Sequence, residues 1–265
     1  MMRLGIVMPV NLQERALLEY TREAVEHLRT KYDAFLYVIC NPLHVCTPDE
    51  LREDLMARFQ GRVTVVNEPG VVQSVSGSWN QGARLAMADS ASYIAFVAND
   101  TRLRDDCLDV LTAFGECTSA DLWSGISYND RPPIDPTDVT DGADFTCFMV
   151  RPSTLHTHGW FDPNFKPAYF EDNDYYARVV LGGGECRIVN AAQFYHHRSA
   201  TIRLDPTAAH HVKYWFELNR SYFARKWGVS EPACSREGVL DQYYRHPFNE
   251  VSRSLSWFPA EGDTA

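Results

Sequence analysis

The sequence lacks several short motifs that would identify a function directly. It has no GxGxxG, which argues against the usual dinucleotide-binding fingerprint, and no GxxxxGK[ST], which argues against a P-loop. GxSxG is also missing, which weakens the case for a serine hydrolase. The seven cysteines form no CxxC pair, so zinc-ribbon and dithiol redox sites are not expected and a reducing cytoplasm fits best.

Long apolar runs and an excess of positive charge are missing as well. No stretch approaches the roughly 20 apolar residues of a membrane span, and the N-terminal apolar run is too short for a signal peptide. We therefore expect a cytoplasmic protein without an integral membrane segment. The 35 acidic and 25 basic side chains give a net charge of -10, which disfavours binding to bare nucleic acid but does not exclude divalent cations, which acidic clefts attract.

What the sequence does contain is an alternation of apolar runs and amphipathic segments, with 45% hydrophobic residues to form a core. The predicted strands lie at residues 4–8, 34–40, 63–66, 93–98 and 122–126. The predicted helices lie at residues 13–31, from 48 onward, 74–88 and 108–116. The second of these helices has a capping box, with Thr47 as the N-cap and Glu50 as its partner. This alternation predicts an α/β fold with a mixed, mostly parallel sheet flanked by helices.

The pattern changes in the second half of the chain. Residues 128–144 are rich in Asp and Pro and predict a mobile surface loop. Residues 185–189 and 193–197 predict a pair of strands, and residues 206–227 predict a long helix. We expect a main domain over 1–205, a helical extension over 206–251 packed on it, and a flexible tail over 252–265.

The apolar run at residues 93–98 ends in Asn99 and Asp100. A buried strand that ends in a carboxylate brings that charge to the open edge of an α/β sheet, where ligands bind. Mg²⁺ and Mn²⁺ take oxygen ligands and leave positions for substrate phosphates. The alternative is that Asp100 simply belongs to a turn or helix cap.

A second acidic group, Glu171, Asp172 and Asp174, lies in the segment PAYFEDNDYYAR. Acids are common in the first turn of a helix because they oppose the positive end of its dipole. One of them can instead act as a general base. On a helix Glu171 and Asp174 share one face, and Asp172 lies on another. If the face with Asp172 borders the ligand crevice, Asp172 is the base; otherwise Glu171 or Asp174 takes that role.

The segment HHRSAT places two adjacent histidines at the end of a predicted strand. Neighbouring strand residues face opposite ways, so His196 and His197 cannot both bind one metal ion. Arg198 and Ser199 could donate hydrogen bonds to a phosphate beside them. A histidine with a purely structural hydrogen bond is the competing interpretation.

Taken in this order, the motifs resemble those of the inverting family-two glycosyltransferases with a GT-A fold. The likeness covers roughly residues 3–228, and its most specific part is GWFDPNFKPAYFEDNDYYAR. YIAFVANDT is similar to the strand that ends in the family's metal-binding acids, and FYHHRSAT to the strand with its metal-site histidine. The resemblance implies that residues 1–205 form a GT-A catalytic domain.

The resemblance also implies a role for each matching residue. Asp100 and His196 would hold Mn²⁺ or Mg²⁺, and Asp172, or failing it Glu171, would take the proton from the acceptor hydroxyl. The residues expected at the sugar-nucleotide donor are Pro9, Asn11, Asn41, Asn80, Asn99 and Arg198. The residues expected at the acceptor are Trp160, Asp162 and Tyr169.

The implied function is metal-dependent transfer of a sugar from a nucleoside-diphosphate sugar to an acceptor hydroxyl, with inversion at the anomeric carbon. The acceptor could be a glycan, a protein or a modified nucleobase. Two alternatives remain at this stage. One is a catalytically weak module of the same fold that binds a sugar nucleotide or glycan, and the other is a metal-dependent hydrolase or nucleotidyltransferase.

Overall fold

A computed structural model describes residues 2–68, 73–129, 135–197, 206–230 and 234–245 of the chain. Within these residues nine strands form one sheet in the order β3-β2-β1-β4-β8-β6-β9-β5, and β7 pairs with β9 outside this path. The strands are β1 (Arg3–Leu12), β2 (Asp33–Leu43), β3 (Arg62–Asn67), β4 (Tyr93–Val97), β5 (Thr101–Leu103), β6 (Leu122–Ser127), β7 (Val139–Asp141), β8 (Cys147–Val150) and β9 (Cys186–His196). Strands β3, β2, β1 and β4 are parallel, whereas β8 runs antiparallel to both β4 and β6.

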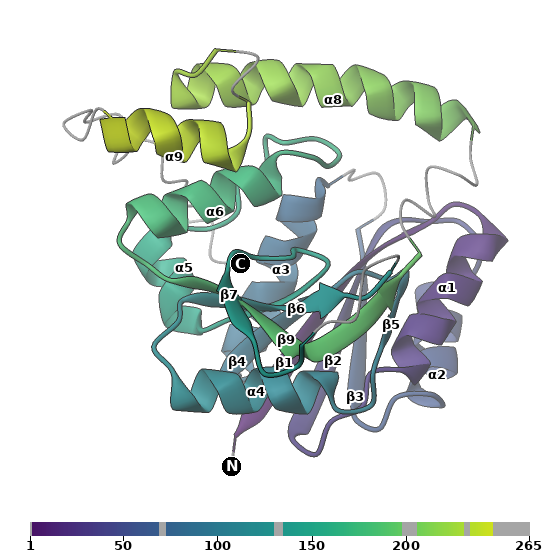
Figure 1. Cartoon of the computed structure of the whole chain (residues 1–265). Coiled ribbons are helices and arrows are strands. Elements are labelled where there is room, and N and C mark those ends of the chain that lie inside the picture. Colours follow the sequence, from purple (N-terminus) through teal and green to yellow (C-terminus); the bar gives the residue numbers. More distant parts are fainter. Residues whose placement is uncertain (1, 69–72, 130–134, 198–205, 231–233, 246–265) are drawn as a thin grey trace.

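Helices cover both faces of this sheet and form a further layer outside it (Figure 1). The helices are α1 (Arg15–Glu26), α2 (Pro48–Met56), α3 (Val75–Ala88), α4 (Cys107–Cys117), α5 (Pro152–His158), α6 (Glu171–Leu181), α8 (Pro206–Trp227) and α9 (Arg236–Arg245). Helices α1, α2 and α4 pack on one face and α3, α5 and α6 on the other. Helices α8 and α9 lie over α6.

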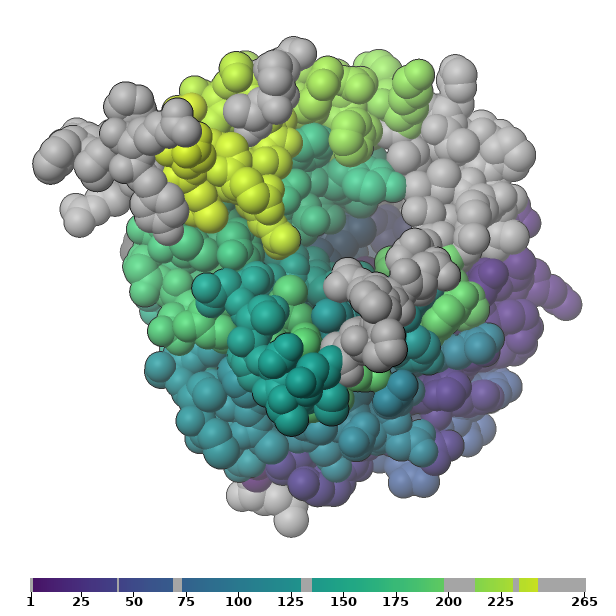
Figure 2. Space-filling model, viewed as in Figure 1, coloured from purple at the N-terminus to yellow at the C-terminus, as the bar shows by residue number. Residues whose placement is uncertain are grey.

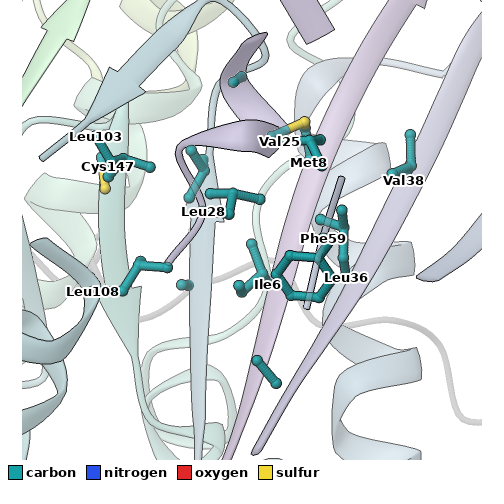
Figure 3. Close-up of a cluster of buried hydrophobic side chains, with 14 of the residues drawn as sticks. Ile6, Met8, Val25, Leu28, Leu36, Val38, Phe59, Leu103, Leu108 and Cys147 are labelled. Atoms are coloured by element: carbon teal, nitrogen blue, oxygen red, sulfur yellow. The ribbon is translucent and has the colours of Figure 1, made fainter. Parts of the chain in front are cut away.

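The largest core lies between the sheet and α1, α2 and α4. Figure 3 shows Ile6, Met8, Leu36 and Val38 from the sheet facing Val25 at its centre. Alternate residues of β1 and β2 point to opposite faces, and both faces are covered, so these strands are apolar along almost their whole length. Such continuous runs are the reason that the strands were predictable from sequence.

Helix α3 packs very closely on β1 because glycine is present at the contact. A Cβ atom at Gly82 would overlap the side chain of Val7. Strand order reverses at this point, since β2 lies on one side of β1 and β4 on the other. In open α/β sheets the crevice at such a reversal, at the carboxyl ends of the strands, is the usual ligand site. The fold therefore directs attention to the ends of β1 and β4.

Several predicted elements are confirmed. The mixed, mostly parallel sheet flanked by helices is present, and α8 has the bounds expected for the long helix. The capping box is present too: Thr47 Oγ1 accepts a hydrogen bond from Glu50 N at 3.2 Å, and Glu50 Oε2 accepts one from Thr47 N at 2.8 Å. Both ends of this motif satisfy backbone donors that would otherwise be unpaired.

Other predictions are wrong. The strand pair expected at residues 185–189 and 193–197 is one strand, β9, with an irregular register against β6 that interrupts the apolar pattern. Strand β2 does not stop at Asn41 but continues to Leu43. The Asp- and Pro-rich segment is not wholly a loop, since β7 pairs with β9, although residues 130–134 lie outside the described residues. The expected tail, 252–265, also lies outside them.

None of the described helices combines the length and the apolar character needed to cross a membrane.

Candidate active site

The turn after β4 brings Asp100 and His196 together. Strand β5 starts at Thr101, which pairs directly with His196 at the end of β9. His197 N donates to Asp100 O at 2.9 Å, which fixes the turn against β9. Asp100 Oδ1 then lies 3.3 Å from His196 Nε2. Two residues that are distant in sequence thus present an oxygen and a nitrogen to the same space.

Asn129, which the sequence analysis did not single out, holds His196 in place. Its Oδ1 accepts from His196 N at 2.9 Å, and its Nδ2 donates to His196 O at 2.5 Å. Its side chain is buried, as expected for an amide that satisfies both polar groups of a neighbouring backbone. An Asn at the end of a strand is too common in turns to be recognised as such a clamp from sequence.

His197 faces a different environment from His196, as expected for neighbours on a strand. Its Nε2 lies 3.1 Å from Glu23 Oε2, and its ring packs 4.7 Å from that of Tyr20 on α1. These contacts attach the end of β9 to α1. The structure therefore gives His197 a packing role and leaves His196 beside Asp100.

The separation of Asp100 Oδ1 and His196 Nε2 suits a divalent cation. Two ligands about 2.1 Å from one ion and at right angles to each other lie about 3 Å apart, close to the observed 3.3 Å. Imidazole nitrogen and carboxylate oxygen are both ligands that Mn²⁺ accepts. Among the described residues no group of three His, Cys, Asp or Glu side chains is arranged to hold a metal. The pair therefore fits an ion that takes its other ligands from a substrate or water.

Pro9 and Asn11 lie at the carboxyl end of β1, next to the end of β4, on the same half-buried side of the strand. Within the described residues Asn11 Oδ1 is buried and has no hydrogen-bond partner. A buried amide oxygen without a donor is costly, so such an atom is a candidate for contact with a ligand. Asn99 is less available, since its Nδ2 donates to Thr21 Oγ1 of α1 at 2.9 Å.

The other residues expected at the donor are engaged with the backbone or lie outside the described structure. Asn41 Nδ2 donates to Gln73 O, and its Oδ1 accepts from Gln73 N at 3.0 Å. Asn80 is buried on α3, with its Nδ2 donating to Phe161 O at 2.7 Å and its Oδ1 accepting from Phe161 N at 3.0 Å. Both amides therefore hold loops in place. Arg198 lies outside the described residues.

The start of α6 follows a strained turn. Tyr169 and Phe170 have φ angles of 81° and 73°, in the left-handed region that residues with side chains rarely adopt. Such a conformation costs about 1–3 kcal/mol per residue and persists only where the surroundings enforce it. Asn219 of α8 contributes to this, because its Nδ2 donates to Ala168 O at 2.7 Å and to Tyr169 O at 3.2 Å.

The three acids of α6 have different surroundings. Glu171 is only 7% exposed, and within the described residues its Oε2 has no hydrogen-bond partner. Asp174 is fully buried and accepts from Arg178 Nε and Trp227 Nε1, both at 3.0 Å. Asp172 is half-buried on the other face of the helix. Glu171 and Asp174 thus share the buried face, and Asp172 is the carboxylate that a ligand reaches most easily.

Burial controls the protonation of this acidic turn. It raises the pKa of Glu171 well above the usual range, and the neighbouring Asp172 charge raises it further. Burial also raises the pKa of Asp172, while hydrogen bonds from backbone N–H groups and the charge of Arg236 lower it. Because Glu171 lies deeper, the first proton that the two acids take up as pH falls resides mainly on Glu171. Asp172 is then the more readily ionised of the two.

Two of the residues expected at the acceptor lie inside the protein. Trp160 is 8% exposed and packs within the core, with the Arg84 guanidinium 4.8 Å from its ring centre. Asp162 accepts from Lys226 Nζ at 2.7 Å and from Tyr222 Oη at 2.8 Å. Burial alone would raise the pKa of Asp162, but Lys226 and these hydrogen bonds lower it. Tyr169 is half-buried, with its ring 5.6 Å from that of Phe216.

Asp144 is a second residue that sequence reasoning missed. It belongs to the segment between the turn that carries Asp100 and the acids at the start of α6. Ala98 N, at the end of β4, donates to Thr146 O at 2.9 Å, and Thr146 N donates to Asp144 Oδ1 at 3.0 Å. Asp144 is half-buried, and its charge raises the pKa of Asp172. Residues 143–146 therefore lie between the turn that carries Asp100 and the helix that carries Asp172. Figure 2 shows the surface hollowed between α6 and α1.

No protein-family model and no curated protein sequence matches the chain. Solved structures do match it. The structure of S. aureus TarS is 13% identical with a TM-score of 0.57, and the match covers 94% of this chain and 44% of TarS. The structure of S. aureus TarS 1-349 in complex with UDP-GlcNAc is also 13% identical, with a TM-score of 0.58 over 92% of this chain and 73% of that one.

A third match is the structure of GalNAc-T7 with UDP, GalNAc and Mn²⁺. It is 13% identical with a TM-score of 0.59, over 74% of this chain and 43% of GalNAc-T7. The chain thus spans less than half the length of the GalNAc-T7 chain and of the longer of these two TarS chains. At this identity the likeness concerns the arrangement of the backbone, and on that basis the chain has the GT-A fold of the nucleotide-sugar glycosyltransferases.

Proposed function

We propose that the chain is a metal-dependent, inverting glycosyltransferase that moves a sugar from a nucleoside-diphosphate sugar to an acceptor hydroxyl. The observation that carries this proposal is the pair formed by Asp100 Oδ1 and His196 Nε2, 3.3 Å apart at the carboxyl edge of the sheet. Residues 143–146 connect this pair to the helix that carries Asp172. A metal-binding pair and an accessible base beside one crevice are what the reaction requires.

Asp100 and His196 would hold Mn²⁺ or Mg²⁺, and the chemistry that such an ion would supply is stabilisation of the negative charge on the departing diphosphate. Manganese in the GalNAc-T7 structure supports this choice. Pro9 and Asn11, at the end of β1, would contact the nucleoside, with the unpartnered Asn11 Oδ1 accepting a hydrogen bond from it. Asn41, Asn80 and Asn99 support the surrounding loops through their existing hydrogen bonds.

Asp172 would act as the general base. The acceptor hydroxyl gives its proton to the Asp172 carboxylate, and the resulting oxygen forms a bond to the anomeric carbon. The bond from that carbon to the diphosphate breaks, and its electron pair leaves with the nucleoside diphosphate. Because attack comes from the side opposite the leaving group, the anomeric configuration inverts. The deeper and more readily protonated Glu171 is less suited to this role.

Tyr169 is the remaining candidate for contact with the acceptor. It precedes the acidic turn and is half-buried, so part of its ring can pack on a sugar or another flat group. Trp160 and Asp162 have their interactions inside the protein and are not included in this proposal. A glycan, a protein side chain and a modified nucleobase all carry a suitable hydroxyl, although the net charge of -10 does not favour DNA.

The first experiment is a thermal-shift screen with UDP-GlcNAc and UDP-GalNAc, with and without Mn²⁺. These donors are chosen because UDP sugars or their parts are bound in the matching structures. A ligand at about 100 times its Kd should stabilise the protein by about 2.7 kcal/mol, and we expect this effect to require Mn²⁺. A stabilising donor is then incubated with an acceptor library, and both UDP release and glycosylated product are measured.

Variants at the metal pair make the test specific. Asp100→Asn should abolish the Mn²⁺-dependent thermal shift, whereas Asp105→Asn, an exposed acid on the next turn, should leave it unchanged. Binding of the donor without any turnover would indicate a sugar-nucleotide-binding module instead. Steady release of phosphate or diphosphate rather than UDP would indicate a hydrolase or nucleotidyltransferase. Either result would reject the proposed transferase.

A further inference from the structure

Arg236, the first residue of α9, lies at the boundary between the two segments that carry Asp144 and Asp172. Its Nη1 donates to Ala143 O at 3.1 Å, next to Asp144. Its guanidinium also lies 4.6 Å from the ring centre of Tyr176, which is one helical turn after Asp172 on the same side of α6. One side chain therefore contacts both the segment before β8 and the helix with the proposed base.

The charges around Asp172 explain why the position of Arg236 matters for the ionisation of that carboxylate. Glu171 and Asp174 lie on the same helix as Asp172. Asp144 faces this helix from the segment before β8, and its negative charge opposes the ionisation of Asp172. The nearby cations Arg178 and Lys226 are already bound to Asp174. Arg236 supplies a positive charge that acts on Asp172 from α9, even though its Nε also lies 2.8 Å from Glu237 Oε1.

We propose that Arg236 is a positioning residue of the transfer site, which holds residues 143–144 against the face of α6 that carries Asp172 and keeps a positive charge beside that carboxylate. This inference rests on the proposed function, because it assigns Arg236 a part in the same reaction. It also means that the C-terminal helix α9 completes the site rather than merely covering the domain. Arginine suits both tasks, since its planar group can stack on a ring and donate hydrogen bonds at the same time.

The test compares Arg236→Met, Arg236→Lys and Arg225→Met in the full-length protein. Arg225 is exposed on α8, outside the proposed site, and serves as the matched control. The kcat and KM of sugar transfer are measured as a function of pH. A base must be ionised, so the rate falls as pH drops through its pKa.

Loss of the positive charge in Arg236→Met should raise the pKa of Asp172 and move the acidic limb of the kcat profile to higher pH by about half a unit or more. Arg236→Lys keeps the charge and should restore the position of this limb, but not the full kcat, because lysine cannot stack and donate in the same way. Asp144→Asn should move the limb in the opposite direction. A purely structural role for Arg236 would lower the rate at every pH without moving the limb, and would overturn the proposal.

A second measurement does not depend on activity. The melting temperatures of Arg236→Met, Asp172→Asn and the double variant form a cycle that isolates the interaction between the two residues. We expect a stronger coupling at pH 8 than at pH 5, because a larger fraction of Asp172 is ionised at the higher pH. If the wild type transfers no sugar, the proposed function fails, while this coupling still shows whether Arg236 acts on Asp172. Additive effects at both pH values would overturn the inference itself.

Discussion

The two sides of the proposed site are stabilised in different ways. The side formed by β1, β4 and their helices rests on an apolar core, in which side chains such as Leu36 and Val38 are fully buried. The side formed by α6, α8 and α9 also has apolar contacts, but a network of buried charges runs through it. Asp162, Asp174 and Lys226 form this network. The first side presents the carboxyl ends of its strands and a few polar side chains. The second side presents carboxylates whose charge depends on their surroundings.

Under the proposed function, the first side would bind the metal ion and the nucleotide, and the second side would take up the proton. Residues at the ends of buried strands are held rigidly, which suits the placement of a metal ion and a nucleotide. The proposed base, Asp172, by contrast lies on a helix whose electrostatic environment is set by acids and cations from several segments. We therefore expect changes in α9 to alter the pKa of Asp172 without disturbing the strands of the proposed donor site. The following predictions test this separation, from the largest expected effect to the smallest.

The largest effect should come from Asp172→Asn. Removal of a general base lowers a rate by about 10²–10⁴-fold, so kcat should fall by this amount while the donor-induced thermal shift is kept. The matched control is Asp49→Asn, which changes an exposed acid at the same position of the first turn of α2. Transfer at the wild-type rate by Asp172→Asn would remove Asp172 from the mechanism.

Asp174→Asn should destabilise the outer layer strongly. It leaves Arg178 without its buried counter-charge and leaves Lys226 with Asp162 alone, and the breaking of a buried ion pair typically costs about 3–5 kcal/mol. Urea unfolding monitored by tryptophan fluorescence measures this cost. The double variant Asp174→Leu with Arg178→Met should recover part of it, because both members of that buried pair are then removed while Lys226 keeps Asp162 as its partner. A loss below about 1 kcal/mol would show that the network contributes little.

Leu36→Ala tests the apolar side. Truncation of a fully buried leucine costs about 2–5 kcal/mol through lost burial and the cavity that remains. Since no charge is involved, this cost should be the same at pH 5 and pH 8. Urea titrations at both values check the expectation. A strong pH dependence of the difference from wild type would contradict the assignment of this side to apolar packing.

Glu171→Gln should change the free energy of unfolding least, and it should raise this free energy rather than lower it. The folded state holds the pKa of Glu171 above its unfolded value, so the ionised form destabilises the protein. At low pH the ionisation of Glu171 therefore makes no difference between the wild type and the variant. As pH rises from about 4.3 towards the raised pKa, the wild type becomes less stable relative to the variant. Glutamine should give a gain of about 1 kcal/mol or more at pH 8 and little at pH 4. Melting curves at the two pH values measure this, and equal differences would refute it.

The apolar half of the fold was predictable because its strands are buried on both faces. Continuous apolar runs in β1, β2 and β4 have no competing interpretation once turn residues bound them, and the capping box fixed the start of α2. Strands β5 and β7 are three residues long and depend on pairing with β9, so no periodicity reveals them. The irregular register of β9 against β6 was mistaken for a break between two strands.

The candidate site was predictable only where polar residues follow such strands. The proximity of Asp100 and His196 follows from the pairing of β5 with β9, but Asp144 lies in a segment where acids are common and gave no signal. Arg236 was missed because α9 reaches the site by tertiary packing that no spacing encodes. Asn80, Trp160 and Asp162 show that polar or aromatic residues within a motif can also serve the packing of that motif, which no spacing distinguishes from contact with a ligand.

The position of Lys226 has a consequence for dissecting this protein. Its ammonium lies 2.7 Å from Asp162 and 2.8 Å from Asp174, two acids that belong to the α/β part of the chain. If the chain were cut before α8, both carboxylates would lose this cation, and Phe165 and Phe170 would lose the aromatic rings that cover them. Such a fragment should misfold or precipitate, so engineered fusions and minimised versions of the protein need to retain α8 and α9.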